Sequence, residues 1–254
     1  MDPVVAKTPV DLPVALVTGG AVRVGRSICE RLAVDSFRVA IHYNGSRQAA
    51  DDLVGKLADL GLKADSFCFD LTRPGATGKL VEKVIATTGR IDLLVNNAAV
   101  FVVDDGEMTD LAMMKVLNMD VPTRLVELVT PYLIETGGSI VNIADLAGIV
   151  EFQRFKAYSL TKKALLSLTL RKALDLATHG VRVNAVCPGA VLFPEWYSPQ
   201  KRREVIDGIP MGREGTPEDI AGAVAYLATA PFVTGQTLCV DGGRMAALMR
   251  QLAE

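Results

Sequence analysis

The sequence predicts a doubly wound α/β fold built on one parallel sheet. Short runs of β-branched and aliphatic residues alternate with longer helical patterns along the whole chain of 254 residues. The runs are almost uninterrupted in apolar character, which is typical of strands that helices cover on both faces. Glycines stand where the intervening helices should end, as Gly61, Gly89 and Gly180 do.

The strands are expected at 14–18, 38–43, 63–69, 92–96, 139–143, 181–187 and 237–240. Segments with apolar spacings of three and four lie between them and predict helices, for example at 25–34, 49–60, 78–87 and 158–178. No linker or repeat divides this pattern. We therefore expect a flexible tail at 1–12 followed by one domain at 13–254.

Residues 193–215 interrupt the alternation with proline, glycine and charged residues, around a possible short helix at 199–206. The segment follows a strand end, where ligands bind in such sheets. We interpret it as a substrate loop that acts as a mobile lid, with an ordinary surface excursion as the alternative.

Composition excludes several classes of protein. The formal net charge is −2, without the basic surplus that a nucleic-acid binder carries. No uncharged apolar stretch is long enough for a membrane span, and the N-terminus lacks the pattern of a signal peptide. The four cysteines show no metal-binding spacing, so we expect buried free thiols and a cytoplasmic location.

The first strand runs into a glycine-rich turn that opens a helix, at 18–25. Glycine lets backbone amides approach a diphosphate, so Gly19, Val24 and Gly25 are expected to bind a dinucleotide at this helix N-terminus. Arg23 occupies the middle glycine position of the turn, where it could bond a phosphate or merely face solvent.

The end of the second strand indicates which dinucleotide binds. An acid there would bond both ribose hydroxyls of NAD, and none is present between residues 38 and 50. Tyr43, Asn44, Ser46 and nearby Arg47 stand there instead, and with Arg23 they favour NADPH over NADH. His42 could assist, although a structural histidine is the alternative.

Asp70 and Leu71 follow the third strand and would lie near the adenine. The alternative for Asp70 is a helix N-cap.

Tyr158 and Lys162 are four residues apart on a predicted helix, so they share a face. An ammonium near the phenol is expected to lower the pKa of Tyr158 from about 10. That would make Tyr158 a general acid near neutral pH.

Together these features resemble the short-chain dehydrogenase/reductase family from about residue 14 to 243. The motifs that carry the resemblance are Thr18–Gly25, Asp70-Leu71, Asn96-Asn97-Ala98, Asn118, the strand 139–143, Tyr158 with Lys162, Pro188-Gly189 and Asp241-Gly242-Gly243. The resemblance implies a single-domain Rossmann fold with seven parallel strands in the order 3-2-1-4-5-6-7. It also implies a homotetramer.

The resemblance further implies roles for individual residues. Tyr158 would donate a proton, Lys162 would bond the nicotinamide ribose, and Asn118 would hold a relay water behind Lys162. Other residues would line the cofactor, namely Asn97, Ala98, Ala99, Pro188 and Gly189.

Several positions depart from the family pattern, and the first is Asp145. Asp145 stands thirteen residues before Tyr158, where the usual family member has a serine. An ionised aspartate accepts hydrogen bonds from N–H groups but cannot donate one to a ketone. Phe101 could stack on a flat heterocycle, and Arg23 lies near the same pocket. This set is similar to pteridine reductases of the dihydromonapterin reductase type, although Ala99 and Phe193 depart from family patterns.

The sequence thus predicts an NADPH-dependent oxidoreductase that reduces a dihydropterin, with Asp145, Tyr158, Lys162 and Asn118 as catalytic residues. Arg23, Phe101, Asp145 and Tyr158 are expected to bind the substrate. Asp145 could instead be a benign variant or a protonated donor, and Phe101 could be a core aromatic. The alternative functions are an NADPH-dependent 3-oxoacyl or other ketone reductase, and a dinucleotide-sensing protein without turnover.

Overall fold

The computed structural model describes residues 12–101 and 108–253, so the predicted tail lies almost wholly outside the described residues. Within the described part, seven parallel strands form one sheet in the order β3-β2-β1-β4-β5-β6-β7, which confirms the predicted fold class and strand order. In chain order they are β1 (Val14–Val17), β2 (Arg38–Tyr43), β3 (Ala64–Cys68), β4 (Leu93–Asn96), β5 (Ser139–Ile143), β6 (Arg182–Pro188) and β7 (Thr237–Val240).

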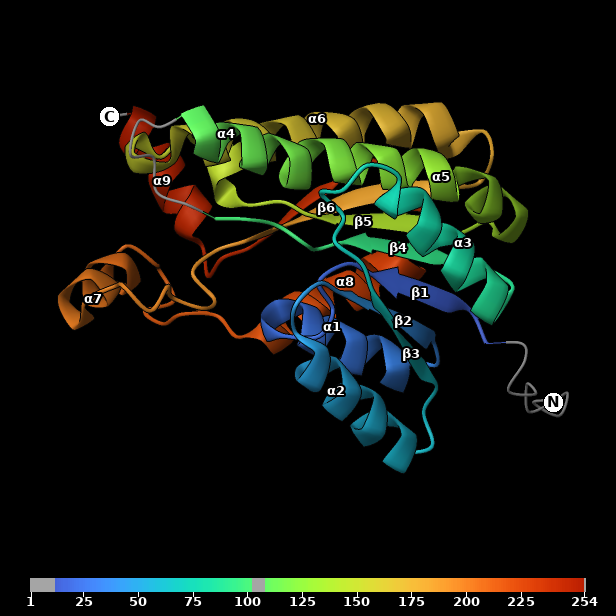
Figure 1. Ribbon diagram of the computed structural model, residues 1–254. Helices are drawn as coiled ribbons and strands as arrows, with labels where there is room; N and C mark the ends of the chain where they lie inside the picture. The colour runs from blue at the N-terminus through green and yellow to red at the C-terminus, as the bar shows by residue number, and fades with distance from the viewer. Residues whose placement is uncertain (1–11, 102–107, 254) are drawn as a thin grey trace, which may run out of the picture.

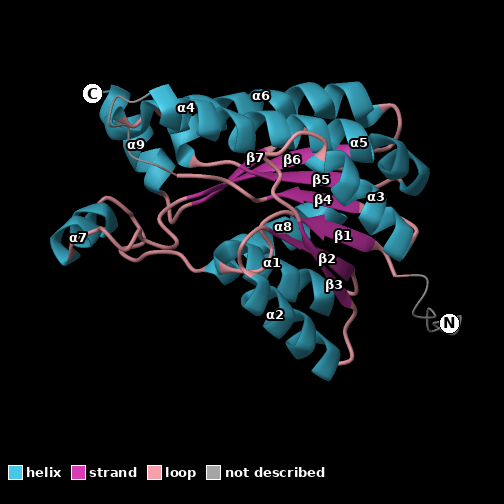
Figure 2. Ribbon diagram, in the orientation of Figure 1, coloured by secondary structure: helices cyan, strands magenta, loops and turns pink. Residues whose placement is uncertain are grey.

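Helices lie on both faces of this sheet (Figures 1 and 2). One face is covered by α1 (Arg23–Val34), α2 (Arg47–Asp59) and α8 (Pro217–Thr229). The opposite face is covered by α3 (Ala76–Thr88), α5 (Val121–Thr136) and α6 (Lys156–Ala177). The described chain also contains α4 (Met108–Lys115), the π-helix η1 (Val116–Asp120), the 3₁₀ turns η2 (Leu146–Gly148) and η3 (Gln153–Phe155), α7 (Pro199–Asp207) and α9 (Arg244–Ala253).

The central strand β1 explains why its sequence is apolar throughout. Ala15 and Val17 pack into the core layer beneath α1, α2 and α8, whereas Val14 and Leu16 pack into the opposite layer. Successive strand residues point to opposite faces, so a strand covered on both sides needs apolar residues at every position.

The predicted helix stops are confirmed in their backbone geometry. Gly89 caps the end of α3 with φ of 79°, and its N–H donates to the carbonyl of Ile85 over 2.8 Å. Gly61 and Gly180 follow the ends of α2 and α6 with φ of 74° and 73°. A side chain would strain this left-handed conformation, which glycine adopts freely.

All four thiols are free, but the prediction that they are buried is only partly right. Cys29 and Cys187 are buried and Cys239 is half-buried, whereas Cys68 is exposed at the end of β3. Because β3 is an edge strand, its residues are less covered than those of the central strands. The thiol of Cys68 donates to the carbonyl of Asn44 over 3.3 Å.

The strands end at one edge of the sheet, and α7 and α9 lie at that edge (Figure 1). The loops after β1, β4, β5 and β6 converge there, which brings together residues far apart in the sequence. This edge is where open α/β sheets place their ligands.

Candidate active site

A cavity of about 690 Å³ opens at the carboxyl edge of the sheet. Its lining includes Gly19 after β1, Asn97 after β4, Asp145 after β5, Gly189 after β6 and Tyr158 of α6. Ligand pockets typically measure about 300–1,000 Å³, so this cavity can hold an organic ligand together with part of a dinucleotide.

Hydrogen bonds join the glycine-rich turn to the end of β4. The Thr18 hydroxyl oxygen accepts from the N–H groups of Asn97 and Ala98 over 2.9 and 3.0 Å. The Asn97 amide donates in return to the carbonyls of Thr18 and Gly19 over 2.9 and 3.1 Å. Asn97 therefore holds the turn from behind while it lines the cavity. Thr18 belongs to the quoted motif, but no role was predicted for it.

The N-terminus of α1 is left open toward the cavity. Its N-cap, Val22, provides no side-chain cap, and no acidic residue lies in the first turn. Gly25 packs so closely on the turn that a Cβ there would overlap the carbonyl oxygen of Gly19. Unpaired helix N–H groups with a positive dipole end bind phosphate oxygens, so this terminus fits a diphosphate.

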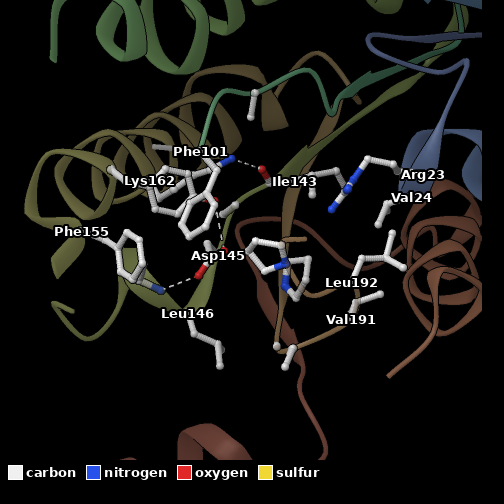
Figure 3. A pocket seen from close by; sticks show the side chains of 18 of the residues that line it. Arg23, Val24, Phe101, Ile143, Asp145, Leu146, Phe155, Lys162, Val191 and Leu192 are labelled. Carbon is white, nitrogen blue, oxygen red and sulfur yellow. Dashed lines mark hydrogen bonds between the residues drawn. The ribbon is translucent and has the colours of Figure 1, made fainter. Parts of the chain in front are cut away.

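Arg23 adds a positive charge to this end of the cavity (Figure 3). Its backbone has φ of 54°, the left-handed conformation that suits the glycine expected at this position. The side chain is exposed and lines the cavity next to Val24. A guanidinium beside an open helix N-terminus is suited to bind a phosphate.

The ring of His42 stabilises the glycine-rich turn between β1 and α1. Its Nδ1 accepts from the N–H of Gly19 over 3.1 Å, so the proton lies on Nε2, which donates to the carbonyl of Phe69 over 3.0 Å. Burial lowers the pKa of the ring, which favours the neutral form that this arrangement needs. Both ring nitrogens are engaged within the protein, which supports the structural alternative, and a contact between His42 and the cofactor remains a prediction.

The other residues predicted at the adenosine end lie at the ends of β2 and β3, outside the lining of the cavity. Tyr43 is buried, Asn44 is exposed and Ser46 is half-buried. They remain predictions as cofactor contacts, as do Asp70 and Leu71.

The alternative that Asp70 caps a helix is wrong, because Gly75 is the N-cap of α3. The Asp70 carboxylate instead accepts from the hydroxyl and N–H of Thr72 over 2.6 and 3.1 Å. These hydrogen bonds, and a weaker contribution from Arg73, lower its pKa.

Asp145, Tyr158 and Lys162 line the cavity together, as the sequence predicted. Figure 3 shows Asp145 and Lys162 in this lining. The Tyr158 hydroxyl donates to Oδ2 of Asp145 over 3.1 Å, and Oδ1 accepts from the N–H of Ala147 over 2.8 Å. The Lys162 ammonium donates to the carbonyl of Ile143 over 2.9 Å and lies 5.6 Å from the centroid of the Tyr158 ring.

The charges at this centre correct one prediction about Tyr158. Burial, and then the neighbouring Asp145, raise the pKa of Tyr158 well above its usual value, so Lys162 does not lower it in this structure. Burial also raises the pKa of Asp145 and lowers that of Lys162 to about 8. The low dielectric around the three groups disfavours each charged form, an effect that the sequence does not reveal.

Asn118 is buried behind the cavity in η1. Its side-chain oxygen accepts from the N–H of Val100, and its amide donates to the Val100 carbonyl and to the Thr161 hydroxyl, over 2.9, 2.9 and 3.2 Å. Asn118 therefore holds the loop after β4 against α6. The predicted relay water behind Lys162 remains a prediction.

Phe101 extends from this loop into the cavity as predicted. Its ring stacks on Phe155 and meets the edge of Tyr158, with centroids 4.8 Å apart in both cases. Phe101 is 44% exposed, so it is not the core aromatic that the alternative proposed. Phe155 also lines the cavity and was not predicted as a site residue. Its position one helical turn before Tyr158 could have indicated that it lies on the same side of the helix.

Part of the predicted substrate loop reaches the cavity, and its short helix is confirmed as α7. Leu192, Phe193, Tyr197 and Lys201 line the cavity wall. The rings of Phe193 and Tyr197 stack with centroids 5.8 Å apart. Residues 193–215 therefore contribute aromatic surface to the site, and their opening and closing remain a prediction.

The chain is similar to many known proteins. The family model described as enoyl-(acyl carrier protein) reductase matches residues 20–244. The chain belongs to the short-chain dehydrogenase/reductase family. It is 30% identical over 244 residues to the 3-oxoacyl-[acyl-carrier-protein] reductase FabG of Staphylococcus epidermidis, covering 90% of this chain and 97% of that relative. It is 34% identical over 239 residues to FabG of Thermotoga maritima, covering 91% and 96%.

Solved structures of this family match closely. A blue fluorescent protein from a metagenomic library, in complex with NADPH, aligns with a TM-score of 0.85 at 31% identity, covering 91% of this chain and 97% of the other. Acetoin dehydrogenase from Enterobacter cloacae aligns with a TM-score of 0.83 at 30% identity, covering 93% and 96%. As a family member the chain is an NAD(P)-dependent oxidoreductase.

Within residues 12–101 and 108–253, every helix is too short or too polar to pass through a bilayer. The same residues contain no cluster of three or more His, Cys, Asp or Glu side chains that could hold a metal ion.

Proposed function

We propose that this chain is an NADPH-dependent reductase in which Tyr158 protonates the group being reduced. One observation carries the proposal: the Tyr158 hydroxyl, hydrogen bonded to Asp145, lines the same cavity as the open N-terminus of α1. A proton donor and a diphosphate site on one cavity are what hydride-transfer chemistry requires.

The dinucleotide end supports NADPH. Arg23 can bind a phosphate, and no carboxylate follows β2 to repel the 2′-phosphate. The solved relative with a TM-score of 0.85 was crystallised with NADPH. When bound, this cofactor supplies the hydride.

The protein's own groups handle the proton. As the carbon–oxygen double bond of a substrate becomes a C–H and an O–H bond, Tyr158 donates its hydroxyl proton to the oxygen. Asp145, whose pKa burial raises, then returns a proton from its carboxylic acid to the phenolate. Lys162 places a positive charge beside the ring, which offsets the transient negative charge.

We propose a 3-oxoacyl thioester as the first candidate substrate, because FabG relatives match this chain over at least 96% of their length. For such a substrate Asp145 would act in its protonated form, which can donate a hydrogen bond to the oxo group as a serine hydroxyl does. The raised pKa of Asp145 supports that form.

A dihydropterin is the second candidate, and the chemistry of Asp145 and Phe101 favours it. A carboxylate accepts from ring N–H and amino groups, which an oxoacyl chain does not offer. The partly exposed ring of Phe101 provides a flat surface at the same wall. These two side chains would hold a planar heterocycle by its edge and its face.

The assembly and the loop belong to the same proposal. Leu170 and Leu174 of α6 are 56% and 72% exposed, and such an apolar outer face supports the homotetramer. The aromatic residues of 193–215 support a loop that covers the substrate.

The decisive experiment measures NADPH oxidation with acetoacetyl-CoA and with dihydrobiopterin, and NADH replaces NADPH as the control. We expect turnover with at least one substrate, and a kcat/KM at least about tenfold higher with NADPH than with NADH. Tight NADPH binding without oxidation by either substrate would favour a dinucleotide-sensing protein instead.

A further inference from the structure

The lining of the cavity is strongly cationic. Five basic side chains line it, and among the lining residues that the structure describes Asp145 is the sole carboxylate. The basic residues are Arg23, Arg154, Lys162, Lys201 and Arg244. A concave surface with such an excess of one sign attracts ligands of the opposite sign.

Three of these cations already have an assigned environment. Arg23 lies at the turn before α1, where the cofactor phosphates are proposed to bind. Lys162 bonds the Ile143 carbonyl near Asp145. Lys201 pairs with Glu204 over 2.9 Å. The remaining two, Arg154 and Arg244, form what we call the outer arginine pair.

The outer arginine pair lies at a different end of the cavity from Arg23. Arg154 is in η3, directly before Phe155, and Figure 3 shows Phe155 and Arg23 at opposite ends of the labelled lining. The cofactor phosphates near Arg23 therefore do not account for Arg154 and Arg244.

Arg244 is held in place by its surroundings. It begins α9, where the Asp241 carboxylate accepts from the N–H groups of Gly243 and Met245 over 2.9 and 2.7 Å. Its guanidinium carbon lies 5.7 Å from the centroid of the Phe152 ring. A guanidinium on an aromatic ring is positioned yet keeps its N–H donors available for an anion.

Neither guanidinium is neutralised within the described protein. Among the carboxylates whose side chains the structure describes, every one lies more than 4.0 Å from the charged nitrogens of Arg154 and Arg244. Asp145 interacts with Arg244 only at longer range, as the weakest of the influences on its carboxyl group. Two arginines with free donors on a pocket wall are suited to bidentate recognition of a carboxylate or phosphate.

We propose that Arg154 and Arg244 bind an anionic group of the substrate, a carboxylate or a phosphate, at the end of the cavity away from the cofactor phosphates. This inference rests on the proposed reductase function and specifies the substrate class: the reducible group lies at Tyr158, and the anionic group lies toward η3 and α9.

The test compares two pairs of substrates that differ in charge. Acetoacetyl-CoA carries phosphates and acetoacetyl-N-acetylcysteamine does not, and dihydrofolate carries carboxylates that dihydrobiopterin lacks. We expect the wild type to favour the anionic member of one pair in kcat/KM. The pair that shows the preference identifies phosphate or carboxylate as the ligand.

Variants then assign the preference to the outer arginine pair. Arg154→Met and Arg244→Met should each lower kcat/KM for the anionic member by about tenfold to a hundredfold, the range for a charge-assisted hydrogen bond. The neutral member should change less than about threefold, so the ratio within the pair measures anion binding alone. Arg244→Lys should retain part of the preference, and Arg124→Met, which removes a cation of α5 that pairs with Glu127 and does not line the cavity, should retain all of it.

Equal kcat/KM for both members of each pair, or a preference that survives both Met variants, would overturn the inference. If the wild type oxidises NADPH with none of the four compounds, the reductase proposal fails by itself. Calorimetric titration of acetoacetyl-CoA and dihydrofolate into the enzyme saturated with NADPH then decides the anion site. Binding that Arg244→Met weakens supports the site, and absence of binding refutes it.

Discussion

The hydroxyl of Tyr158 donates to the carboxylate of Asp145 over 3.1 Å inside the cavity, and both groups have raised pKa values. Two acidic groups that share a hydrogen bond titrate as a coupled pair, and burial makes both of these groups hold their protons more strongly. The pair is thus a proton store at the point where a reduced substrate needs a proton.

Replacing Asp145 by serine should separate the two candidate substrates. Asp145→Ser removes the acceptor for N–H groups and supplies a hydroxyl donor, so kcat/KM for dihydrobiopterin should fall by about tenfold to a hundredfold. The value for acetoacetyl-CoA should be kept or rise. The dissociation constant of NADPH, measured by fluorescence, is the control and should not change. Unaltered dihydrobiopterin turnover would exclude the pteridine candidate.

Lys162 should make stability depend on pH in the alkaline range. Its pKa is lowered from 10.5 to about 8, so between these values the unfolded chain binds the proton that the folded chain has lost. The free energy of unfolding contributed by this group therefore rises with pH across that window, by about 3 kcal/mol in all.

Denaturant titration of the wild type and Lys162→Met at pH 7.5 and pH 10 measures this effect. Relative to the variant, the wild type should gain about 2–3 kcal/mol between the two pH values. A constant difference between the two proteins would show that the Lys162 pKa is not lowered. Lys162→Met should also lose NADPH oxidation.

Gly25 should tolerate no side chain, because the carbonyl of Gly19 occupies the position of its Cβ. Gly25→Ala should destabilise the fold by about 1–3 kcal/mol and weaken NADPH binding at least about tenfold, since the turn and the start of α1 must separate.

Gly55→Ala is the matched control, because Gly55 lies within α2 with no atom near its Cβ position. It should raise stability by about 0.5–1 kcal/mol and leave NADPH binding unchanged. If calorimetry gave the two variants the same stability, the predicted overlap between a Cβ at residue 25 and the Gly19 carbonyl would be wrong.

Arg23 should affect binding more than stability. Arg23→Gly relieves the strain of the left-handed φ of 54°, but glycine increases the conformational entropy of the unfolded chain. Because the two effects oppose each other, the free energy of unfolding should change by less than about 1 kcal/mol. The dissociation constant of NADPH should rise at least about tenfold at low salt, and less at high salt because ions screen the guanidinium.

Arg26→Gln is the control, since Arg26 pairs with Glu30 on the same helix. Unchanged NADPH affinity in Arg23→Gly would remove Arg23 from the phosphate site.

The fold could be predicted because its signals are local and repeated. The central strand β1 is apolar at every position, and Gly89 ends a helix by its backbone freedom alone. For the elements that the sequence named, only the ends differ, typically by one or two residues, because the last turn of a helix or the last strand pair depends on neighbours that periodicity does not specify.

The site could be predicted only in part. The spacing of Tyr158 and Lys162 on one helix, and the resemblance that added Asp145, predicted three residues that line one cavity, and their catalytic roles stay a prediction. The direction of the Tyr158 pKa shift could not be predicted, because it follows from burial that the whole fold creates. Arg154 and Arg244 could not be paired from the sequence either, since η3 and α9 are far apart in the sequence and only the fold brings both arginines to the lining of one cavity.

The two hydrogen bonds of His42 have a consequence for how cofactor preference can evolve or be engineered. They anchor the glycine-rich turn to Phe69, directly after β3, with a buried side chain, so the turn does not depend on the residues that follow β2. Asn44 and Arg47 are exposed beyond this anchor. Selection, natural or in the laboratory, could therefore exchange these outer positions to favour one nicotinamide cofactor over the other without remodelling the scaffold beneath them.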